Sequence, residues 1–228
     1  MNRESVAAVI VAGGIGKRLG LKKPKQFLNV RKAPMIIHSI KAFERNNDIT
    51  SIVVVCHKDF IDYCKKTIKK YKIKKALQVI AGGKTRQESG YNGLAHCPEG
   101  TKYVLIHDAA RPFVSDDLIE RLIKETKKYG AVIPACKVKD TIIEEAKGYI
   151  KSFPERDKLM NVQTPQGFKY ELIAIAHELA EMKKIKNATD DATLIANMGK
   201  RVKVIEGDTE NIKITDKADL ETANRSTE

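Results

Sequence analysis

The residues best suited to chemistry lie near the N-terminus, where an apolar run at 6–11 ends abruptly in glycines. Gly13 and Gly14 follow the run, and Gly16 comes two residues later. Glycines at the tip of a buried strand permit a tight turn and leave backbone N–H groups open to a phosphate. This pattern predicts a backbone cradle for a triphosphate at the end of the first strand of an α/β sheet.

Basic side chains follow the glycine loop directly. Arg18 comes soon after it, and Lys25 stands behind Pro24, which stiffens the chain at that point. The segment 14–20 has one residue too many for the dinucleotide motif G-x-G-x-x-G, and the P-loop motif G-x-x-x-x-G-K-[ST] is absent. We therefore expect Arg18 and Lys25 to face a nucleotide held in neither of these two ways.

The elements that must position this loop alternate along the chain. Apolar runs predict strands at 6–11, 51–56, 77–81, 103–107 and 131–136. Amphipathic segments predict helices at 34–45, 60–71, 86–96 and 116–129. Such alternation favours a doubly wound, mostly parallel, Rossmann-like sheet of the α/β class, whose ligands bind at the carboxyl ends of the strands.

The alternation breaks after Asp140. Two short stretches around Gly148 predict a β-hairpin that projects from the body, within an arm at about residues 137–160. Such a hairpin either covers a site or grips a second subunit, and the residues alone leave both open. Helices near 170–182, 191–198 and 217–224 and a strand at 202–205 complete the chain, which we interpret as one domain over 1–228.

The composition favours anionic partners. Lys and Arg number 42 against 29 Asp and Glu, for a formal net charge of +13. A basic nucleic-acid-binding module is one interpretation, because lysines crowd the segment 65–75. However, Trp is absent and aromatic residues are few, so a base-stacking surface is poorly supplied. We favour instead a solvated helix face, with Phe60, Cys64, Ile68 and Tyr71 buried behind it, and expect no nucleic acid as partner.

Cysteine usage and hydropathy bear on the compartment. The four cysteines lie far apart with no C-x-x-C spacing, which indicates neither disulfides nor a zinc site. No apolar stretch has the length needed to cross a bilayer, so we expect no membrane partner. Together these features predict a cytoplasmic protein.

Seven blocks in register resemble the 2-C-methyl-D-erythritol 4-phosphate cytidylyltransferase family over essentially the whole chain. The blocks are Ala12-Gly-Gly-x-Gly-Lys-Arg with Pro24-Lys-Gln26, Gly82-Gly-Lys-Thr-Arg86 with Ser89, His107-Asp-Ala-Ala-Arg-Pro112, Val138-Lys-Asp-Thr141, Gln163-Thr-Pro-Gln-Gly-Phe168, Thr189-Asp-Asp-Ala192 and Glu206-Gly-Asp-Thr-Glu-Asn-Ile-Lys-Ile-Thr215. The resemblance implies that a polyol phosphate attacks the α-phosphorus of CTP and that pyrophosphate departs. It implies Mg²⁺, or another divalent cation, as cofactor.

The resemblance also assigns roles to individual residues. Arg18 and Lys25 would stabilise the transition state, while Arg156 and Lys213 would position the attacking phosphate. The nucleotide would contact Val11, Ala12, Gly13, Gly14, Gly16, Gly82, Gly83, Arg86 and Ser89. For Arg86, a phosphate contact and a plain helix start are equally open. The acceptor site would contain Asp108, Arg111, Thr141 and Thr164, and Asp108 and Asp208 are the candidate metal ligands. We expect His107 to support Asp108 rather than act as a base.

Two further expectations come from the resemblance. The hairpin resembles an arm that clasps a partner subunit, so Thr141 and Arg156 would serve the neighbour's site in a homodimer. Gly13, Lys84 and Gly90 depart from the common family pattern. A double glycine like Gly13-Gly14 also occurs in a sister group that makes CDP-ribitol from D-ribitol 5-phosphate for wall polymers, so ribitol phosphate is the alternative acceptor.

Overall fold

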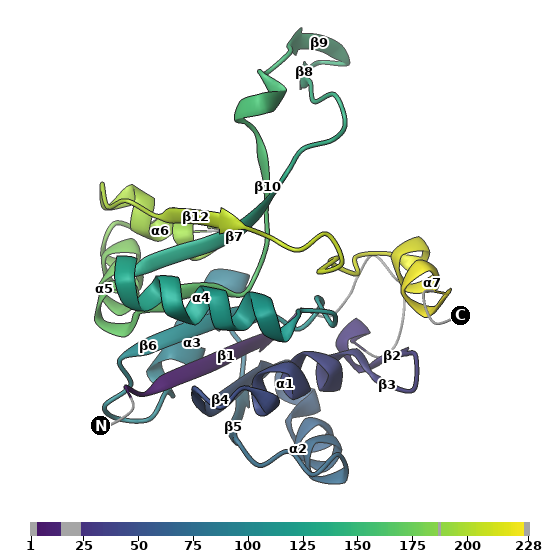
Figure 1. The fold of residues 1–228 in the computed structure, drawn as a ribbon, viewed down its shortest axis with the longest axis vertical. Coiled ribbons are helices and arrows are strands. Elements are labelled where there is room, and N and C mark those ends of the chain that lie inside the picture. Colours follow the sequence, from purple (N-terminus) through teal and green to yellow (C-terminus); the bar gives the residue numbers. More distant parts are fainter. Residues whose placement is uncertain (1–3, 15–23, 187, 226–228) are drawn as a thin grey trace.

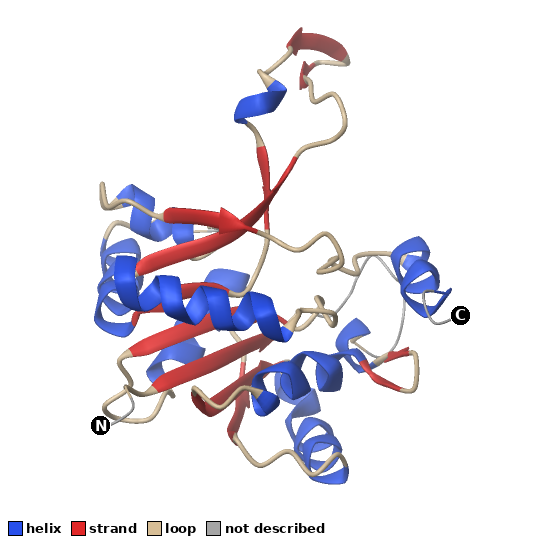
Figure 2. Ribbon diagram, viewed as in Figure 1, coloured by secondary structure: helices blue, strands red, loops and turns tan. Residues whose placement is uncertain are grey.

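A mixed eight-stranded sheet forms the centre of the protein (Figures 1 and 2). The computed structural model describes residues 4–14, 24–186 and 188–225. Four neighbouring strands run parallel, in the order β5 (Ala76–Ala81), β4 (Ile49–Cys56), β1 (Val6–Ala12) and β6 (Tyr103–Asp108). Beyond β6 lie β11 (Gln166–Lys169), β7 (Ala131–Lys137) and β10 (Met160–Val162), with β12 (Lys203–Glu206) paired parallel to β7.

Helices cover both faces of this sheet, which explains why β1 is apolar along its whole length. All seven residues of β1 are buried. Val6, Ala8, Ile10 and Ala12 pack in one core cluster, and Val9 and Val11 pack in another. The first cluster includes residues of α1 (Met35–Arg45), α2 (Ile61–Lys70) and α4 (Asp116–Tyr129). The second includes residues of α3 (Arg86–Ala95), α5 (Tyr170–Met182) and α6 (Ala192–Asn197).

Local signals set the helix ends. Ser115 caps α4 by accepting a hydrogen bond from the Leu118 N–H at 3.3 Å, and Gly130 ends the helix in the left-handed region, with φ of 79°. Thr85 caps α3 in the same way from the Glu88 N–H at 3.1 Å. The start of α3 matters for the site because it places Arg86 and Ser89 beside the carboxyl ends of β5 and β1.

The segment after β7 leaves the body as an arm, which we define as residues 138–159. It contains a small hairpin of β8 (Glu144–Ala146) and β9 (Tyr149–Ser152) and a single 3₁₀ turn at Arg156–Lys158. Figure 1 shows this hairpin at the end of two extended strands that carry it away from the sheet. The chain then returns through β10, which pairs antiparallel with β7.

The predicted elements are confirmed to within about two residues at their ends, and α7 (Lys217–Arg225) closes the described chain. Sequence reasoning missed β10, β11 and the two-residue pair β2 (Asn29–Val30) and β3 (Ala33–Pro34). The omission of β11 is the most important, because this antiparallel strand lies between β6 and β7 inside the sheet. Four residues with one apolar side chain, Phe168, give too weak a periodicity to be detected.

The lysine-rich segment behaves as expected of a solvated helix face. Lys65, Lys66, Lys69 and Lys70 of α2 are exposed. Of the four side chains expected behind them, Cys64 and Ile68 are buried, and Phe60 and Tyr71 are half-buried. Within the described ranges, no helix combines the length and apolar character required to cross a membrane.

Candidate active site

Two glycine loops meet at the carboxyl ends of β1 and β5. The hydroxyl of Ser89 accepts a hydrogen bond from the Gly83 N–H at 3.1 Å and donates one to the Thr85 carbonyl at 2.9 Å. A Cβ atom on Gly13 would lie 3.0 Å from that hydroxyl, and one on Gly82 would lie 2.8 Å from it. A side chain at position 82 would displace the Ser89 hydroxyl, and one at position 13 would press against it. The structure therefore brings four of the predicted nucleotide contacts together.

The neighbouring predicted contacts fall at the same edge of the sheet. Val11 and Ala12 are the last two residues of β1 and are buried, whereas Gly14, two residues after Ala12, is exposed. Gly16 and Arg18 lie outside the described residues, so their predicted roles stay predictions.

Asp108, the last residue of β6, holds two cations. Its Oδ1 accepts from Arg86 Nε at 3.2 Å, and its Oδ2 accepts from Lys213 Nζ at 2.7 Å. Burial raises the pKa of Asp108, but the charges of Arg86 and Lys213 outweigh burial and hold that pKa well below its usual range. Asp108 is thus an ionised carboxylate, and it lies where parallel strands present their ligand sites.

A series of hydrogen bonds through Thr164 and His107 fixes the backbone of Asp108. Its N–H donates to Thr164 Oγ1 at 3.0 Å, and Thr164 Oγ1 lies 3.2 Å from His107 Nδ1. Because the neutral imidazole carries its proton on Nε2, Nδ1 accepts from the Thr164 hydroxyl. His107 Nε2 donates to the Arg111 carbonyl at 3.0 Å. Burial lowers the pKa of His107 to about 4. A neutral imidazole, enclosed in this way, is a support for Asp108, which is the role the sequence predicted for it.

Arg111 ties this edge to the C-terminal part of the chain. Its Nη1 donates to the Asn211 carbonyl at 2.7 Å, and its Nη2 donates to the Val162 carbonyl at 3.2 Å. Asn211 Nδ2 donates to the Thr164 carbonyl at 2.8 Å, and burial lowers the pKa of Arg111. Arg111, three residues beyond β6, thus connects the end of β10 with Asn211. Sequence reasoning gave Asn211 no role, although it lies inside the block that ends at Thr215.

Both predicted lysines reach the same place. Lys25 Nζ donates to the Ile214 carbonyl at 2.6 Å, and Ile214 in turn donates its N–H to the Ala110 carbonyl at 2.9 Å. Ile214 adjoins Lys213 in the chain, so Lys25 is fixed to the same segment that carries Lys213, and its charge also helps to lower the pKa of Asp219. Asp108, Arg111, Thr164 and Lys213 therefore belong to one site, and Lys25 is tied to that site through the backbone of Ile214.

Thr141 and Arg156 lie elsewhere, on the arm. Both are exposed, and Arg156 Nη1 donates only a long bond, 3.4 Å, to the Lys139 carbonyl. They line one shallow pocket of the arm together with Pro154. The structure thus brings these two residues to each other, and Figure 1 shows the arm carrying them away from the sheet.

The predicted metal ligands have other partners. Both carboxylate oxygens of Asp108 face cations, and Asp208 Oδ1 accepts from the Glu210 N–H at 2.9 Å. No group of three or more His, Cys, Asp or Glu side chains suited to a metal occurs in the described part of the chain. These donors do not form a ready metal site made of protein ligands alone, so the two assignments stay predictions.

Sequence reasoning missed one buried carboxylate altogether. Arg86 Nη1 donates to Asp191 Oδ2 at 2.5 Å, and His177 Nε2 lies 3.2 Å from Asp191 Oδ1. The Arg86 guanidinium therefore has two carboxylate partners in the protein. The signal available beforehand was the block Thr189-Asp-Asp-Ala192, whose two aspartates have no distinguishing feature in the sequence.

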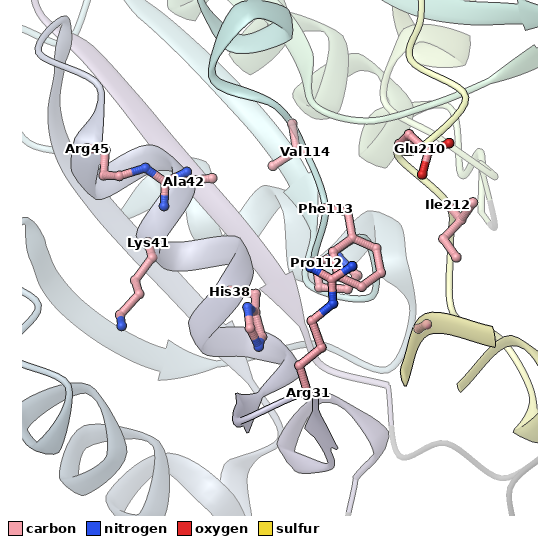
Figure 3. A pocket seen from close by; sticks show the side chains of 11 residues that line it. Arg31, His38, Lys41, Ala42, Arg45, Pro112, Phe113, Val114, Glu210 and Ile212 are labelled. Atoms are coloured by element: carbon pink, nitrogen blue, oxygen red, sulfur yellow. The ribbon is translucent and has the colours of Figure 1, made fainter. Parts of the chain in front are cut away.

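A cavity of about 370 Å³ beside α1 is a separate feature (Figure 3). Its basic residues do not converge on one point. The Arg31 guanidinium lies 4.5 Å from the Phe113 ring centroid, Arg45 pairs with Asp116 at 2.8 Å, and the Lys41 side chain points away from Arg31. This cavity therefore offers no point at which several cations could meet a phosphate, and the glycine loops stay the predicted nucleotide site.

Comparisons with known proteins point to one family. The family model for 2-C-methyl-D-erythritol 4-phosphate cytidylyltransferase (IspD) matches residues 6–227. A protein of that name from Clostridium botulinum is 43% identical, over 96% of this chain and 95% of its own length. One from Bacillus cereus is 41% identical over 93% of both chains. The crystal structure of 4-diphosphocytidyl-2C-methyl-D-erythritol synthase from Anaerococcus prevotii has a TM-score of 0.85, 31% identity and 99% coverage of both chains.

Proposed function

The chain belongs to the 2-C-methyl-D-erythritol 4-phosphate cytidylyltransferase family, and from that premise we propose how its own residues carry out the reaction. The substrates are CTP and 2-C-methyl-D-erythritol 4-phosphate, and the products are 4-diphosphocytidyl-2-C-methyl-D-erythritol and pyrophosphate, a step of isoprenoid biosynthesis. The observation that carries the proposal is the contact of the Lys213 ammonium with Asp108 at the end of β6, together with the hydrogen bond from Lys25 to the adjoining residue Ile214.

The chemistry is a displacement between two anions. An oxygen of the acceptor phosphate forms a bond to the α-phosphorus of CTP, the bond from that phosphorus to the bridging oxygen breaks, and the electron pair leaves with pyrophosphate. A phosphate monoester loses its second proton with a pKa near 6, so near pH 7 it attacks without a base. The neutral, enclosed His107 fits this requirement, because no residue has to remove a proton.

The protein's task is to offset repulsion and to align the attack. Lys213, whose ammonium contacts Asp108 at the end of β6, would receive the acceptor phosphate, and Lys25 would counter charge on the triphosphate. The two glycine loops offer backbone N–H groups and a narrow space for the base and ribose. A donor of this kind commonly contributes about 3 kcal/mol, or a hundredfold in rate.

A divalent cation completes the proposal. Mg²⁺ would neutralise charge on the triphosphate and the leaving pyrophosphate. Because Asp108 and Asp208 already have partners, we propose that phosphate oxygens would supply most of its ligands, with Asp108 as the protein carboxylate that would hold it.

We also propose a homodimer held by the arm. Large apolar side chains on and around the arm are 39–79% exposed, a concentration that favours a protein interface. They are Ile142, Ile143, Tyr149, Ile150, Phe153, Met160 and Val162. In such a dimer, Thr141 and Arg156 of one chain would serve the site of the other.

Subunit mixing tests the dimer. Arg156→Gln and Lys213→Gln would each inactivate their own homodimers. If the arm acts in the neighbouring site, each mixed dimer regains one intact site, so an equal mixture recovers roughly a quarter of wild-type activity. No recovery on mixing, with exchange of subunits verified, would show that both residues act within one chain.

The decisive experiment measures pyrophosphate release with CTP and Mg²⁺. 2-C-methyl-D-erythritol 4-phosphate and D-ribitol 5-phosphate are compared as acceptors at equal concentration. We expect the erythritol phosphate to be favoured by its kcat/KM. A higher kcat/KM with D-ribitol 5-phosphate would mean that ribitol phosphate is the acceptor. Absence of pyrophosphate release with both compounds would refute the proposed function.

Compartment and nucleic-acid binding are tested separately. The four cysteines are free thiols, which supports the proposal of a reducing cytoplasm. Affinity for a random oligonucleotide that falls steeply with salt would instead support a nucleic-acid role for the lysines of α2.

A further inference from the structure

Five ionisable side chains form a continuous chain of contacts through the protein. His177 on α5 contacts Asp191 at 3.2 Å, and Asp191 contacts Arg86 at 2.5 Å. Arg86 contacts Asp108 at 3.2 Å, and Asp108 contacts Lys213 at 2.7 Å. Asp108 and Lys213 belong to the candidate active site. His177 and Asp191 have no role in the proposed reaction.

Asp191 is enclosed by protein on all sides. Its side chain is 1% exposed, and its two oxygens go separately to Arg86 and His177. Gly90 of α3 closes the remaining space, because a Cβ atom there would lie 2.9 Å from Asp191 Oδ1. Burial raises the pKa of Asp191, but Arg86 and His177 lower it further than burial raises it. The carboxylate therefore has one orientation and one charge state.

His177 braces that carboxylate from the other side. Its side chain is 1% exposed, and its ring stacks on Tyr91 with centroids 5.6 Å apart and planes at 22°. A ring held in this way cannot turn without breaking its contact with Asp191. His177 and Gly90 together prevent Asp191 from following Arg86 if the arginine moves.

The planar guanidinium transmits this constraint. Nε of Arg86 is held by Asp108 and Nη1 by Asp191, so the plane is fixed at two points. Without Asp191, Arg86 keeps one partner and turns about it. Asp108 Oδ1 would then lose its fixed position, and the Lys213 ammonium on Oδ2 would move with the carboxylate.

We propose that Asp191, braced by His177, is a positioning residue that orients Arg86 and, through it, the Asp108–Lys213 pair. It contacts no substrate. The inference rests on the proposed function, because Lys213 matters only if it receives the acceptor phosphate. A misplacement of about 1 Å at such a site costs on the order of a hundredfold in rate.

Two adjacent aspartates give a matched comparison. Asp190 Oδ1 accepts from the Thr193 N–H at 2.9 Å and from the Thr193 hydroxyl at 2.7 Å, and it caps the turn that begins α6. Asp190→Asn should lower the melting temperature at most slightly and leave kcat unchanged. Asp191→Asn should lower kcat/KM for the acceptor about 10- to 100-fold and change the Kd for CTP by less than about threefold.

A double-mutant cycle with Arg86→Gln distinguishes positioning from general destabilisation. If Asp191 acts through Arg86, adding Asp191→Asn to Arg86→Gln costs less than about threefold more. Multiplicative losses would overturn the proposal, as would wild-type kinetics in folded Asp191→Asn. Failure of the wild-type protein to release pyrophosphate would instead refute the proposed function.

A second pair of variants serves if Asp191→Asn does not fold. Glutamine at position 177 can still donate a hydrogen bond to Asp191, whereas phenylalanine fills similar space without a donor. His177→Gln should retain at least about half of the wild-type kcat, and His177→Phe should lose about tenfold with CTP affinity retained. Equal kcat values in the two variants would overturn the role of the brace.

Discussion

Acid should destabilise this protein through His107, and the size of the effect follows from where that ring lies. The ring is fully buried, and burial lowers its pKa to about 4, against an ordinary value of 6.5. Between these two pH values the unfolded chain binds a proton that the folded protein does not. Stability therefore falls as pH falls from about 6.5, and the loss is complete near pH 4.

The magnitude follows from the shift in pKa. A difference of 2.5 pKa units, from 6.5 to about 4, corresponds to about 3 kcal/mol at 1.36 kcal/mol per unit. About 2 kcal/mol of this is lost between pH 7 and pH 4.5. For a protein whose total stability is typically 5–15 kcal/mol, such a loss is measurable.

The assay is urea unfolding at a series of pH values, with His107→Gln as the comparison. Glutamine has an amide that can donate toward the Arg111 carbonyl and an oxygen that can accept from Thr164, but it does not titrate. We expect the free energy of unfolding of the variant to fall by about 2 kcal/mol less than that of the wild type over the same pH interval.

Comparing the pH dependence of the free energy of unfolding in the two proteins cancels the contributions of the other titrating groups. Asp108 and Asp191 have lowered pKa values, so their contributions disappear only below the ordinary carboxyl range, and both are present in the variant. Parallel pH profiles for the two proteins would refute the reasoning, because they would mean that His107 titrates alike in the folded and unfolded states.

Three further outcomes are expected. Lys25→Gln should lower kcat about a hundredfold, measured by pyrophosphate release, with the fold checked by circular dichroism; unaltered turnover would contradict its role. Thr164→Val removes the acceptor for the Asp108 N–H and should lower the free energy of unfolding by about 1–3 kcal/mol in urea titrations, whereas an unchanged midpoint would mean that water replaces the hydroxyl. Tyr149→Glu combined with Ile150→Lys should convert a dimer to a monomer in light scattering and lower activity at least tenfold; a dimer of wild-type activity would exclude the arm as the interface.

Most of the fold could be predicted because each long strand or helix keeps one hydrophobic pattern along its whole length. The runs that became β1, β4 and β6 are buried on both faces and therefore appear as continuous apolar stretches. The antiparallel β11 has no such pattern. Its place between β6 and β7 is decided by pairing with both neighbours, and pairing is not encoded in its four residues.

The candidate site likewise contains residues that the sequence pointed out and residues that it did not. Glycines that directly follow β1 and β5 marked in advance the edge of the sheet where the two glycine loops meet. Asp191 and Asn211 gave no comparable signal, since their roles depend on Arg86 and Arg111 reaching them from distant parts of the chain. Asp190 and Asp191 are adjacent and chemically identical, and only the fold makes one a helix cap and the other a partner of Arg86.

The chain of contacts from His177 to Lys213 is buried at one end and exposed at the other. This difference explains how Lys213 can be held by Asp108 and still be available to a phosphate. At one end, the side chains of His177 and Asp191 are 1% exposed; at the other, that of Lys213 is 43% exposed. Water weakens the contact at the exposed end, so an arriving phosphate, which carries up to two charges, can compete with Asp108 for the ammonium. At the enclosed end no such competition occurs, because the buried Asp191 carboxylate is out of reach of an arriving phosphate. The protein thus keeps Lys213 close to its working position while the rest of the chain of contacts stays in place. The same gradient explains why changes at the buried end should alter kcat for the acceptor more than the affinity for CTP.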